Sequence, residues 1–408
     1  MSSEDVSLRE HGPAVSVPLT TDAGRALAAA SILRSATPDP GREGHWLLRA
    51  GSTIGAVRVP GGPVVRIAPK TSVSRLFFLL GFSLDPARAW RDSREGTIDT
   101  GGHDDVVPSL AHAVERQIDA ALRLGVLQGY RTVEESAPFV RGRIREADQV
   151  RRHFGRTPPV EISHDDYTAD TAENRILRAA VERLLHLPGV SGPVRRRLAR
   201  HRVRLADALP LVLGRELPRW QATRLNSRYQ PALRLAEAVL RGTSPEHRPA
   251  GAAPLAMDGF LIDMNRLFED FVTVGLREAL REHGLTARLQ DPHHLDTAES
   301  VRMRPDLVVR TGDGRTPVAV VDAKYKVVKA DGHLNDDLYQ ALAYAAVLGL
   351  GEAHLVYAAG RVPLRVHEVR GAGIRLYQHS LDLSCPAEGL LSELERIAGQ
   401  LAGTEARL

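Results

Sequence analysis

The 408-residue sequence predicts a multi-domain α/β protein. Short apolar strand-like segments come first, a long stretch with helical spacing follows, and helices and strands then alternate. A segment rich in proline and glycine, residues 244–254, separates the last two patterns. We therefore expect a β-rich N-terminal unit over residues 1–105, a helical, arginine-rich region over 106–243, a linker over 244–254, and an α/β domain over 255–408.

The N-terminal unit is predicted from its short strands. Residues 45–48, 54–59 and 64–67 are strand-like, and Gly61-Gly62-Pro63 marks a turn between the last two. Residues 75–81 are apolar and form a buried helix or a buried strand, which periodicity does not decide. Residues 1–44 show little periodicity.

The middle region is predicted to be helical because apolar residues recur every three or four positions from Val107 onward. Helices are expected over residues 171–187, 193–208 and 230–241, and Thr171 is placed to cap the first of them. Between Arg141 and Arg241 there are 21 arginines. Such a stripe fits a phosphate backbone, and it fits a solvated helical face equally well.

The C-terminal domain is predicted from alternating helical and strand patterns. The expected helices cover residues 264–283, 335–348 and 390–401, and the expected strands cover residues 302–310, 318–326, 354–358 and 364–369.

Lysine is the most informative residue type in the chain. There are only four lysines, Lys70, Lys324, Lys326 and Lys329, so 50 of the 54 basic residues are arginine. Lysine differs from arginine in offering a compact point charge with a movable pKa. Three lysines within six residues, beside Asp322, therefore indicate an active site. Isolated Lys70 is expected at a solvated strand end, and a contact with a partner or a phosphate is the alternative.

Two aspartates and a lysine suggest a metal-dependent hydrolase. A hairpin between the strands over 302–310 and 318–326 would bring Asp306 and Asp322 to the same end of a sheet, and Lys324 would share a face with Asp322. Converging carboxylates suit Mg²⁺, and a lysine can orient the attacking water. The alternative is a surface salt bridge between Asp322 and Lys324. The apolar run before Asp322 argues against it, because buried charge is costly without a partner.

Adjacent His293 and His294 suggest a metal site less strongly, because neighbouring histidines in a proline-containing turn usually point apart into solvent.

These residues resemble the motif of the PD-(D/E)xK nuclease superfamily, with Asp306, Asp322 and Lys324 at its three positions. Glu269 would match the acidic residue that many members carry on the helix before the sheet. Gln340 and Tyr344 match a Gln-x-x-x-Tyr pattern on the helix after it. The alternatives are a solvated helix residue for Glu269, and helix surface and core for Gln340 and Tyr344. The resemblance implies a restriction-endonuclease-like fold for the C-terminal domain.

Further matches resemble the McrC family, the nuclease subunits of McrBC 5-methylcytosine-specific restriction systems. They are Asp322-Ala-Lys-Tyr-Lys326, Ile67-Ala-Pro-Lys70, Arg141-Gly-Arg-Ile144, Thr171-Ala-Glu-Asn-Arg175 and Leu225-Asn-Ser-Arg-Tyr229. This resemblance implies an Mg²⁺-dependent DNA endonuclease of a restriction or antiviral defence system. Asp306, Asp322 and Glu269 would serve the metal, Lys324 would serve catalysis, and Lys326, Gln340 and Tyr344 would bind DNA or support the site.

The same resemblance implies a partner, an McrB-like AAA+ GTPase that forms a hexameric ring. The N-terminal part would dock on the ring and stimulate its GTPase. The sequence contains no Gly-x-x-x-x-Gly-Lys-[Ser/Thr] motif for binding nucleotide itself. A non-enzymatic adaptor with an inert nuclease fold and a stand-alone repair nuclease are the alternatives.

The expected location is the cytoplasm. The first residues lack a signal-peptide pattern, no apolar run is long enough to span a membrane, and the single Cys385 cannot form an internal disulfide.

Overall fold

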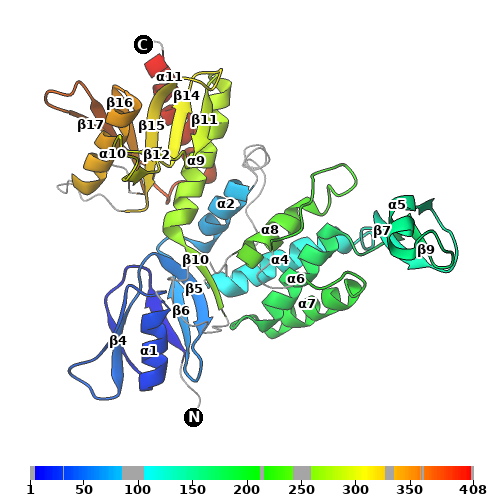
Figure 1. Cartoon of the computed structure of the whole chain (residues 1–408). Helices are drawn as coiled ribbons and strands as arrows, with labels where there is room; N and C mark the ends of the chain where they lie inside the picture. The colour runs from blue at the N-terminus through cyan, green and yellow to red at the C-terminus, as the bar shows by residue number, and fades with distance from the viewer. Residues whose placement is uncertain are drawn as a thin grey trace. The chain divides into compact units, whose positions relative to one another are not determined.

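The computed structural model describes residues 5–30, 32–84, 105–211, 216–241, 259–326, 335–358, 360 and 363–405 (Figure 1). The chain forms two compact units, one combining Met1–Ser109 with Arg248–Leu408 and the other comprising Leu110–His247. The predicted linker over 244–254 and Lys329 lie outside the described residues.

The first unit begins with two small sheets. A four-stranded sheet has the order β1-β6-β5-β10, and a three-stranded sheet has the order β2-β4-β3. Their elements, together with the helix between β2 and β3, are β1 (Val6–Arg9), β2 (Val15–Pro18), α1 (Thr21–Ala29), β3 (Ser35–Pro38), β4 (His45–Arg49), β5 (Thr53–Arg58), β6 (Val64–Ala68) and β10 (Gly259–Asp263). The strands expected over 45–48, 54–59 and 64–67 are confirmed, and residues 1–44 contain more regular structure than their weak periodicity indicated.

Strand β10 joins distant parts of the sequence, because it pairs antiparallel with β5 and leads directly into helix α9 (Met264–Glu282). Asp263 caps this helix by accepting a hydrogen bond from the Asn265 backbone N–H at 2.9 Å. The segment over 75–81 is part of helix α2 (Val73–Leu84), so the ambiguity resolves as a helix. Helix α2 packs on α9 through the rings of Phe82 and Phe271, whose centroids lie 5.0 Å apart.

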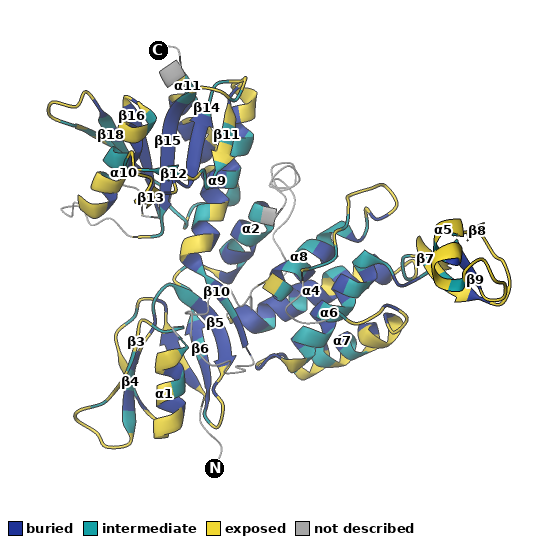
Figure 2. Cartoon of the chain, viewed as in Figure 1, coloured by how far each residue is buried: buried dark blue, intermediate teal, exposed yellow. Residues whose placement is uncertain are grey.

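The C-terminal part of this unit is built on a six-stranded mixed sheet with the order β11-β14-β15-β16-β18-β17. Central strands β14 and β15 are almost entirely buried (Figure 2). Apolar residues of α10 pack against the sheet. The elements are β11 (Thr286–Leu289), β12 (His293–His294), β13 (Arg302–Met303), β14 (Leu307–Arg310), β15 (Pro317–Lys324), α10 (Asn335–Leu348), β16 (Glu352–Tyr357), β17 (Arg365–Glu368), β18 (Arg375–Ser380) and α11 (Ala387–Glu405).

Two expectations for this domain need correction. The strand expected over 302–310 is broken into β13 and β14, and the break contains Pro305, which has no N–H to donate to a ladder. His293 and His294 form short strand β12, which pairs with β13, and both are half-buried rather than solvated.

The second unit is mostly helical but contains a sheet that the helical prediction for 106–243 missed. Strands β7 (Gly129–Ala137), β8 (Arg143–Ile144) and β9 (Val160–Thr168) form it in the order β7-β9-β8. Strands β7 and β8 are largely exposed (Figure 2), so they carry little of the apolar alternation that identifies a strand. The helices are α5 (Glu146–His153), α6 (Ala172–His186), α7 (Gly192–Arg204) and α8 (Gln230–Arg241), and α4 (Val106–Leu122) enters the unit from its N-terminal side.

Within the described residues, no helix is both long and apolar enough to cross a bilayer.

The β5–β10 pairing depends on Gly55, which has a φ of +122° and no room for a side chain. A Cβ atom there would lie 2.1 Å from the Phe260 carbonyl oxygen. Gly55→Ala is therefore expected to destabilise the protein by about 2–4 kcal/mol, combining backbone strain with a steric clash. Chemical denaturation measures this as a lower midpoint. Gly81→Ala is the control, because its Cβ would meet nothing within 4 Å inside α2; an equal loss in both variants would contradict the argument.

Candidate active site

The β14–β15 pairing brings Asp306 and Asp322 together. Leu307 pairs with Val321 in antiparallel register, so Asp306, one residue before β14, lies opposite Asp322. The Ala323 backbone N–H donates a hydrogen bond of 2.8 Å to Asp306 Oδ2. Both carboxylates are buried. The two aspartates therefore meet as the expected hairpin requires.

Lys324 lies on the same face of β15 as Asp322, two residues further along. Its ammonium forms an ion pair with Asp322 Oδ2. Burial of Lys324 favours the neutral amine, but the Asp322 carboxylate outweighs burial and raises the pKa of Lys324. This lysine is therefore a firmly protonated cation beside the carboxylates.

Glu269 reaches the same carboxylates from helix α9. The side-chain amide of Gln290 bridges them, donating to Asp306 Oδ1 at 3.0 Å and also to Glu269 Oε1. Gln290 follows β11 with a φ of +51°, and its backbone N–H donates to the Asp306 carbonyl at 3.0 Å. The sequence analysis did not identify Gln290, because it belongs to no motif and reaches the site only through the fold.

The three carboxylates destabilise one another's charged forms. Burial, followed by the charge of Glu269, raises the pKa of Asp306 to about 6. Burial, followed by the charge of Asp306, raises the pKa of Asp322 to about 7. The pKa of Glu269 is also raised, first by burial and then by Asp270 and Asp322. One ammonium thus serves three neighbouring carboxylates, and the site favours an additional cation.

The donor set fits magnesium. Mg²⁺ is commonly held by one or two carboxylates, with water and substrate oxygens completing its octahedron. Among the described residues, no three His, Cys, Asp or Glu side chains already form a group that could hold a metal ion. The fit therefore rests on the facing pair Asp306 and Asp322, with Glu269 joined to Asp306 through the Gln290 amide.

Helix α10 contributes polar side chains beside this cluster. Gln340 Nε2 donates to the Tyr344 hydroxyl at 2.8 Å. Tyr344 is buried, and burial followed by the charge of Asp322 raises its pKa. The structure thus brings Tyr344 into the electrostatic reach of Asp322, and Gln340 bonds to it from the exposed surface.

Lys326 has a partner that the sequence analysis did not identify. Its ammonium lies 2.8 Å from Oδ1 of Asp337, a buried residue in the first turn of α10. The Tyr357 hydroxyl donates to Asp337 Oδ2 at 3.3 Å. An acidic residue in a first turn is ordinary for any helix, so nothing local in the sequence marked Asp337.

Comparison with protein families identifies the chain. The model of the McrBC 5-methylcytosine restriction system component family matches residues 48–358. The chain belongs to this McrBC family. No curated protein matches it.

Two solved structures are similar. A chain of the refined half-complex from a tetradecameric assembly of Thermococcus gammatolerans McrB AAA+ hexamers with bound McrC matches with a TM-score of 0.57 and 16% identity, covering 98% of this chain and 100% of that chain. A chain of the cryo-EM structure of the T. gammatolerans McrBC complex matches with a TM-score of 0.41 and 18% identity, covering 68% of this chain and 88% of that chain. The first likeness shows a shared fold.

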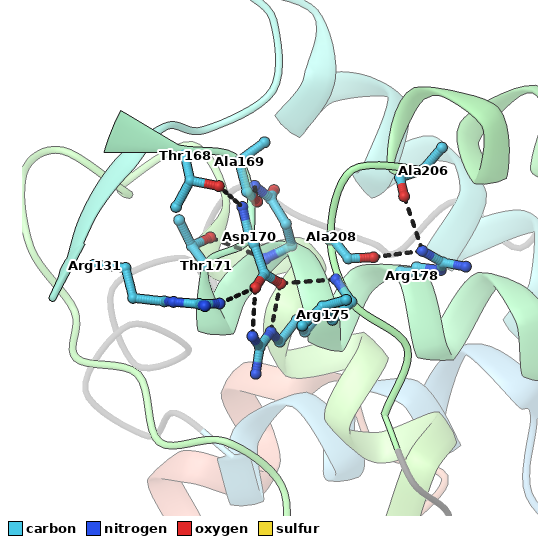
Figure 3. Close-up of polar contacts among 11 residues, drawn as sticks. Arg131, Thr168, Ala169, Asp170, Thr171, Arg175, Arg178, Ala206 and Ala208 are labelled. Atoms are coloured by element: carbon cyan, nitrogen blue, oxygen red, sulfur yellow. Dashed lines mark hydrogen bonds and ion pairs between the residues drawn. The ribbon is translucent and has the colours of Figure 1, made fainter. Parts of the chain in front are cut away.

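Within the McrBC match, the segment Thr171–Arg175 adjoins the polar centre of the second unit (Figure 3). Asp170 accepts hydrogen bonds from Arg131 on β7, from Nε (2.6 Å) and Nη2 of Arg175 on α6, and from the Leu209 backbone N–H at 2.7 Å. Thr171 accepts from the Asn174 backbone N–H at 3.3 Å, so the predicted cap is confirmed. Asp170 therefore ties the small sheet to the helices of its unit.

Several arginines of the predicted basic stripe have internal roles. Arg197 pairs with buried Glu115 at 2.8 Å. Arg178 donates to the backbone carbonyls of Ala206, at 3.0 Å, and Ala208 (Figure 3). These contacts show that arginines in this unit stabilise its fold. The sequence analysis had considered only binding to a phosphate backbone and a solvated helical face.

Asp170 yields a prediction about stability and pH. Asp170→Asn is expected to lower the free energy of unfolding at pH 7 by about 2–3 kcal/mol, because charge-assisted hydrogen bonds to two arginines are lost. Bonding to Arg175 is the main reason that the pKa of Asp170 lies below its ordinary value of 3.8. Its contribution is therefore fully present above pH 4 and is lost as pH falls through the lowered pKa.

Urea denaturation between pH 7 and pH 3 measures the difference in free energy of unfolding between wild type and Asp170→Asn. This difference should narrow only at the acidic end of the range. Exposed Asp207→Asn is the control, with an expected change within about 0.5 kcal/mol. A difference between wild type and Asp170→Asn that stays constant to pH 3 would exclude the ionised carboxylate as its source.

Proposed function

We propose that the chain is the Mg²⁺-dependent DNA endonuclease subunit of an McrBC-type restriction and antiviral defence system in the cytoplasm. The observation that carries this proposal is the facing pair of buried carboxylates, Asp306 and Asp322, with Lys324 paired to one of them. A PD-(D/E)xK motif requires this juxtaposition. Membership of the McrBC family supports the assignment to a restriction system.

Each residue has a role that follows from its position. Asp306 and Asp322 would hold Mg²⁺, and Glu269 would support the metal directly or through water. Bound Mg²⁺ would polarise the phosphodiester and lower the pKa of a bound water. Lys324 orients the attacking water and neutralises charge that develops on the phosphate. Gln290 fixes the orientation of Glu269 and Asp306 before the metal arrives.

Lys326, Gln340 and Tyr344 are proposed to support the site or contact DNA. Gln340 and Lys326 are exposed, whereas Tyr344 is buried and Lys326 is paired with Asp337. Exposed Gln340 is thus the best placed of the three to meet a DNA strand, and Tyr344 acts by holding it.

The proposed partner is an McrB-like AAA+ GTPase that forms a hexameric ring. The fold shared with a chain from an assembly of McrB AAA+ hexamers with bound McrC supports it. In this proposal the partner hydrolyses the nucleotide, and this sequence contains no P-loop motif. We propose that the N-terminal β-rich part docks on the ring and stimulates its GTPase, and that modified or foreign DNA is the substrate.

Two other functions make different predictions. A non-enzymatic adaptor would stimulate the partner without cleaving DNA, and the assembled carboxylate–lysine cluster argues against it. A stand-alone repair nuclease would cleave DNA without any GTPase. Incubating the chain with modified DNA and Mg²⁺, with and without the GTPase and GTP, separates the three functions.

The assignment predicts that Asp322→Ala and Lys324→Ala each lower DNA cleavage at least about a hundredfold, because each removes a group that stabilises charge at the phosphate. Binding to the partner and stimulation of GTP hydrolysis should remain. Gel assays of cleavage and phosphate-release assays measure the two activities. The matched control is Asp336→Asn, an exposed carboxylate in the first turn of α10. Wild-type cleavage by either alanine variant would refute the assignment.

A further inference from the structure

A short hairpin is built on two residues of the candidate site. Strands β12 and β13 pair antiparallel, with His293 opposite Met303, and they lie within the connection between β11 and β14. This connection begins at Gln290, directly after β11, and ends at Asp306, directly before β14. The Gln290 backbone N–H donates to the Asp306 carbonyl at 3.0 Å. Two site residues therefore close the hairpin at its base, at the end of the sheet where the carboxylates meet (Figure 2).

Hydrogen bonds hold the hairpin in shape at both ends. Near the base, Asp291 Oδ2 accepts from Arg310 Nη2 on β14 at 2.8 Å. In the turn between β12 and β13, Asp296 accepts from the Ser300 hydroxyl at 2.6 Å and from the Val301 backbone N–H at 2.8 Å. The hairpin is thus a preformed element, fixed to the sheet at its base and braced in its turn.

Two arginines of this hairpin face solvent. Arg302 and Arg304 are exposed, whereas Met303 between them and Pro305 after them are buried, so the side chains alternate between core and solvent. Met303 belongs to the apolar cluster that packs between the sheet and α10. Arg304 Nε donates to the Gln290 carbonyl at 3.2 Å. No acidic side chain in the described part of the chain forms an ion pair with either guanidinium.

The place and charge of these arginines suit the DNA backbone. Arg304 lies two residues before Asp306, so both arginines border the place where a phosphate would approach the carboxylate pair. A guanidinium presents planar donors that match phosphate oxygens, and its charge offsets the repulsion between DNA and the buried carboxylates. Of the acidic residues in the hairpin, Asp291 and Asp296 accept the internal bonds described above, and Glu299 lies in the turn, far from the base.

We propose that the β12–β13 hairpin holds the DNA backbone beside the phosphate to be cleaved, with Arg302 and Arg304 contacting phosphate oxygens. This inference rests on the proposed nuclease function and adds a DNA-binding surface to it. The hairpin contacts are independent of base sequence, because they reach the backbone and not the base edges. An acidic protein surface would also suit two arginines, but the shared base of hairpin and site favours DNA.

The first test measures DNA binding without cleavage. Fluorescence anisotropy of a labelled duplex of about 30 base pairs is followed with the full chain in EDTA, at salt concentrations of about 50–200 mM. Arg302→Gln and Arg304→Gln should each weaken binding about three- to tenfold and lower the slope of log affinity against log salt by about 0.9. Arg315→Gln should change neither quantity, because this exposed arginine lies in the turn between β14 and β15, at the opposite end of both strands.

Three results would overturn the inference. They are a wild-type chain that does not bind the duplex, a double variant that binds it with wild-type affinity and salt dependence, and an equal loss in Arg315→Gln. A double variant that binds DNA normally but no longer binds the GTPase partner would assign the hairpin to an acidic protein surface instead. If Arg304→Gln disturbs Gln290, Arg302→Gln carries the test alone, because its side chain has no printed bond to the site.

The second test uses the complete system with partner, GTP and Mg²⁺. Arg302→Gln should raise KM for DNA about three- to tenfold and leave kcat and stimulated GTP hydrolysis unchanged, because the hairpin binds the backbone and does not touch the reacting atoms. Wild-type KM in the double variant, with Asp322→Ala inactive, would overturn the role of the hairpin and leave the nuclease assignment standing. If wild type binds DNA through the hairpin but does not cleave it, the nuclease assignment falls and the binding surface remains.

Discussion

The site depends on the burial of Asp306 and Asp322 opposite one another at the end of β14 and β15. Two carboxylates in this position repel, and burial makes the repulsion stronger. Strand β15 supplies two compensating groups, the Ala323 N–H and the Lys324 ammonium, and the segment after β11 supplies a third, the Gln290 amide. Strand β15 and the segment after β11 must therefore lie where their donors can reach the two carboxylates. Charge that these donors leave uncompensated is what a magnesium ion would neutralise.

A second constraint lies in the order of the chain. Residues 110–247 form a separate unit, so the chain must return afterwards and re-enter the first unit. It does so as β10, which completes the N-terminal sheet before α9 carries Glu269 to the site. The first described element of the α/β domain expected over 255–408 is therefore a strand that belongs to the N-terminal sheet. Its first helix packs on α2 through Phe271, so the helix bearing Glu269 is held partly by residues outside that range.

The sequence was informative where the determinants of structure are local. Helix α10 occupies the range expected for it, and the hairpin that joins the two aspartates followed from alternation and a turn. Gln290 and Asp337 could not be found in this way. Their partners lie 16 and 11 residues away, and each has a common local explanation as a loop or helix-start residue. The sheet of the second unit was missed because β7 and β8 are mostly exposed and its buried apolar cluster is only Ala137, Val160 and Ile162, which leaves little periodic apolar signal.

The chain has arginine and lysine at different kinds of site, and the geometry of the contacts explains the difference. In the second unit, the guanidinium of Arg175 engages Asp170 through two nitrogens, and that of Arg178 reaches two carbonyl groups. Such forked contacts suit a structural role, because they fix both partners. At Asp322 the requirement is different. The Lys324 ammonium pairs with Oδ2 of Asp322 as a point charge. A guanidinium at position 324 would favour bidentate pairing with both oxygens and compete with Mg²⁺ for the same carboxylate. The rarity of lysine in this chain thus marks the place where a forked donor would interfere with the proposed chemistry.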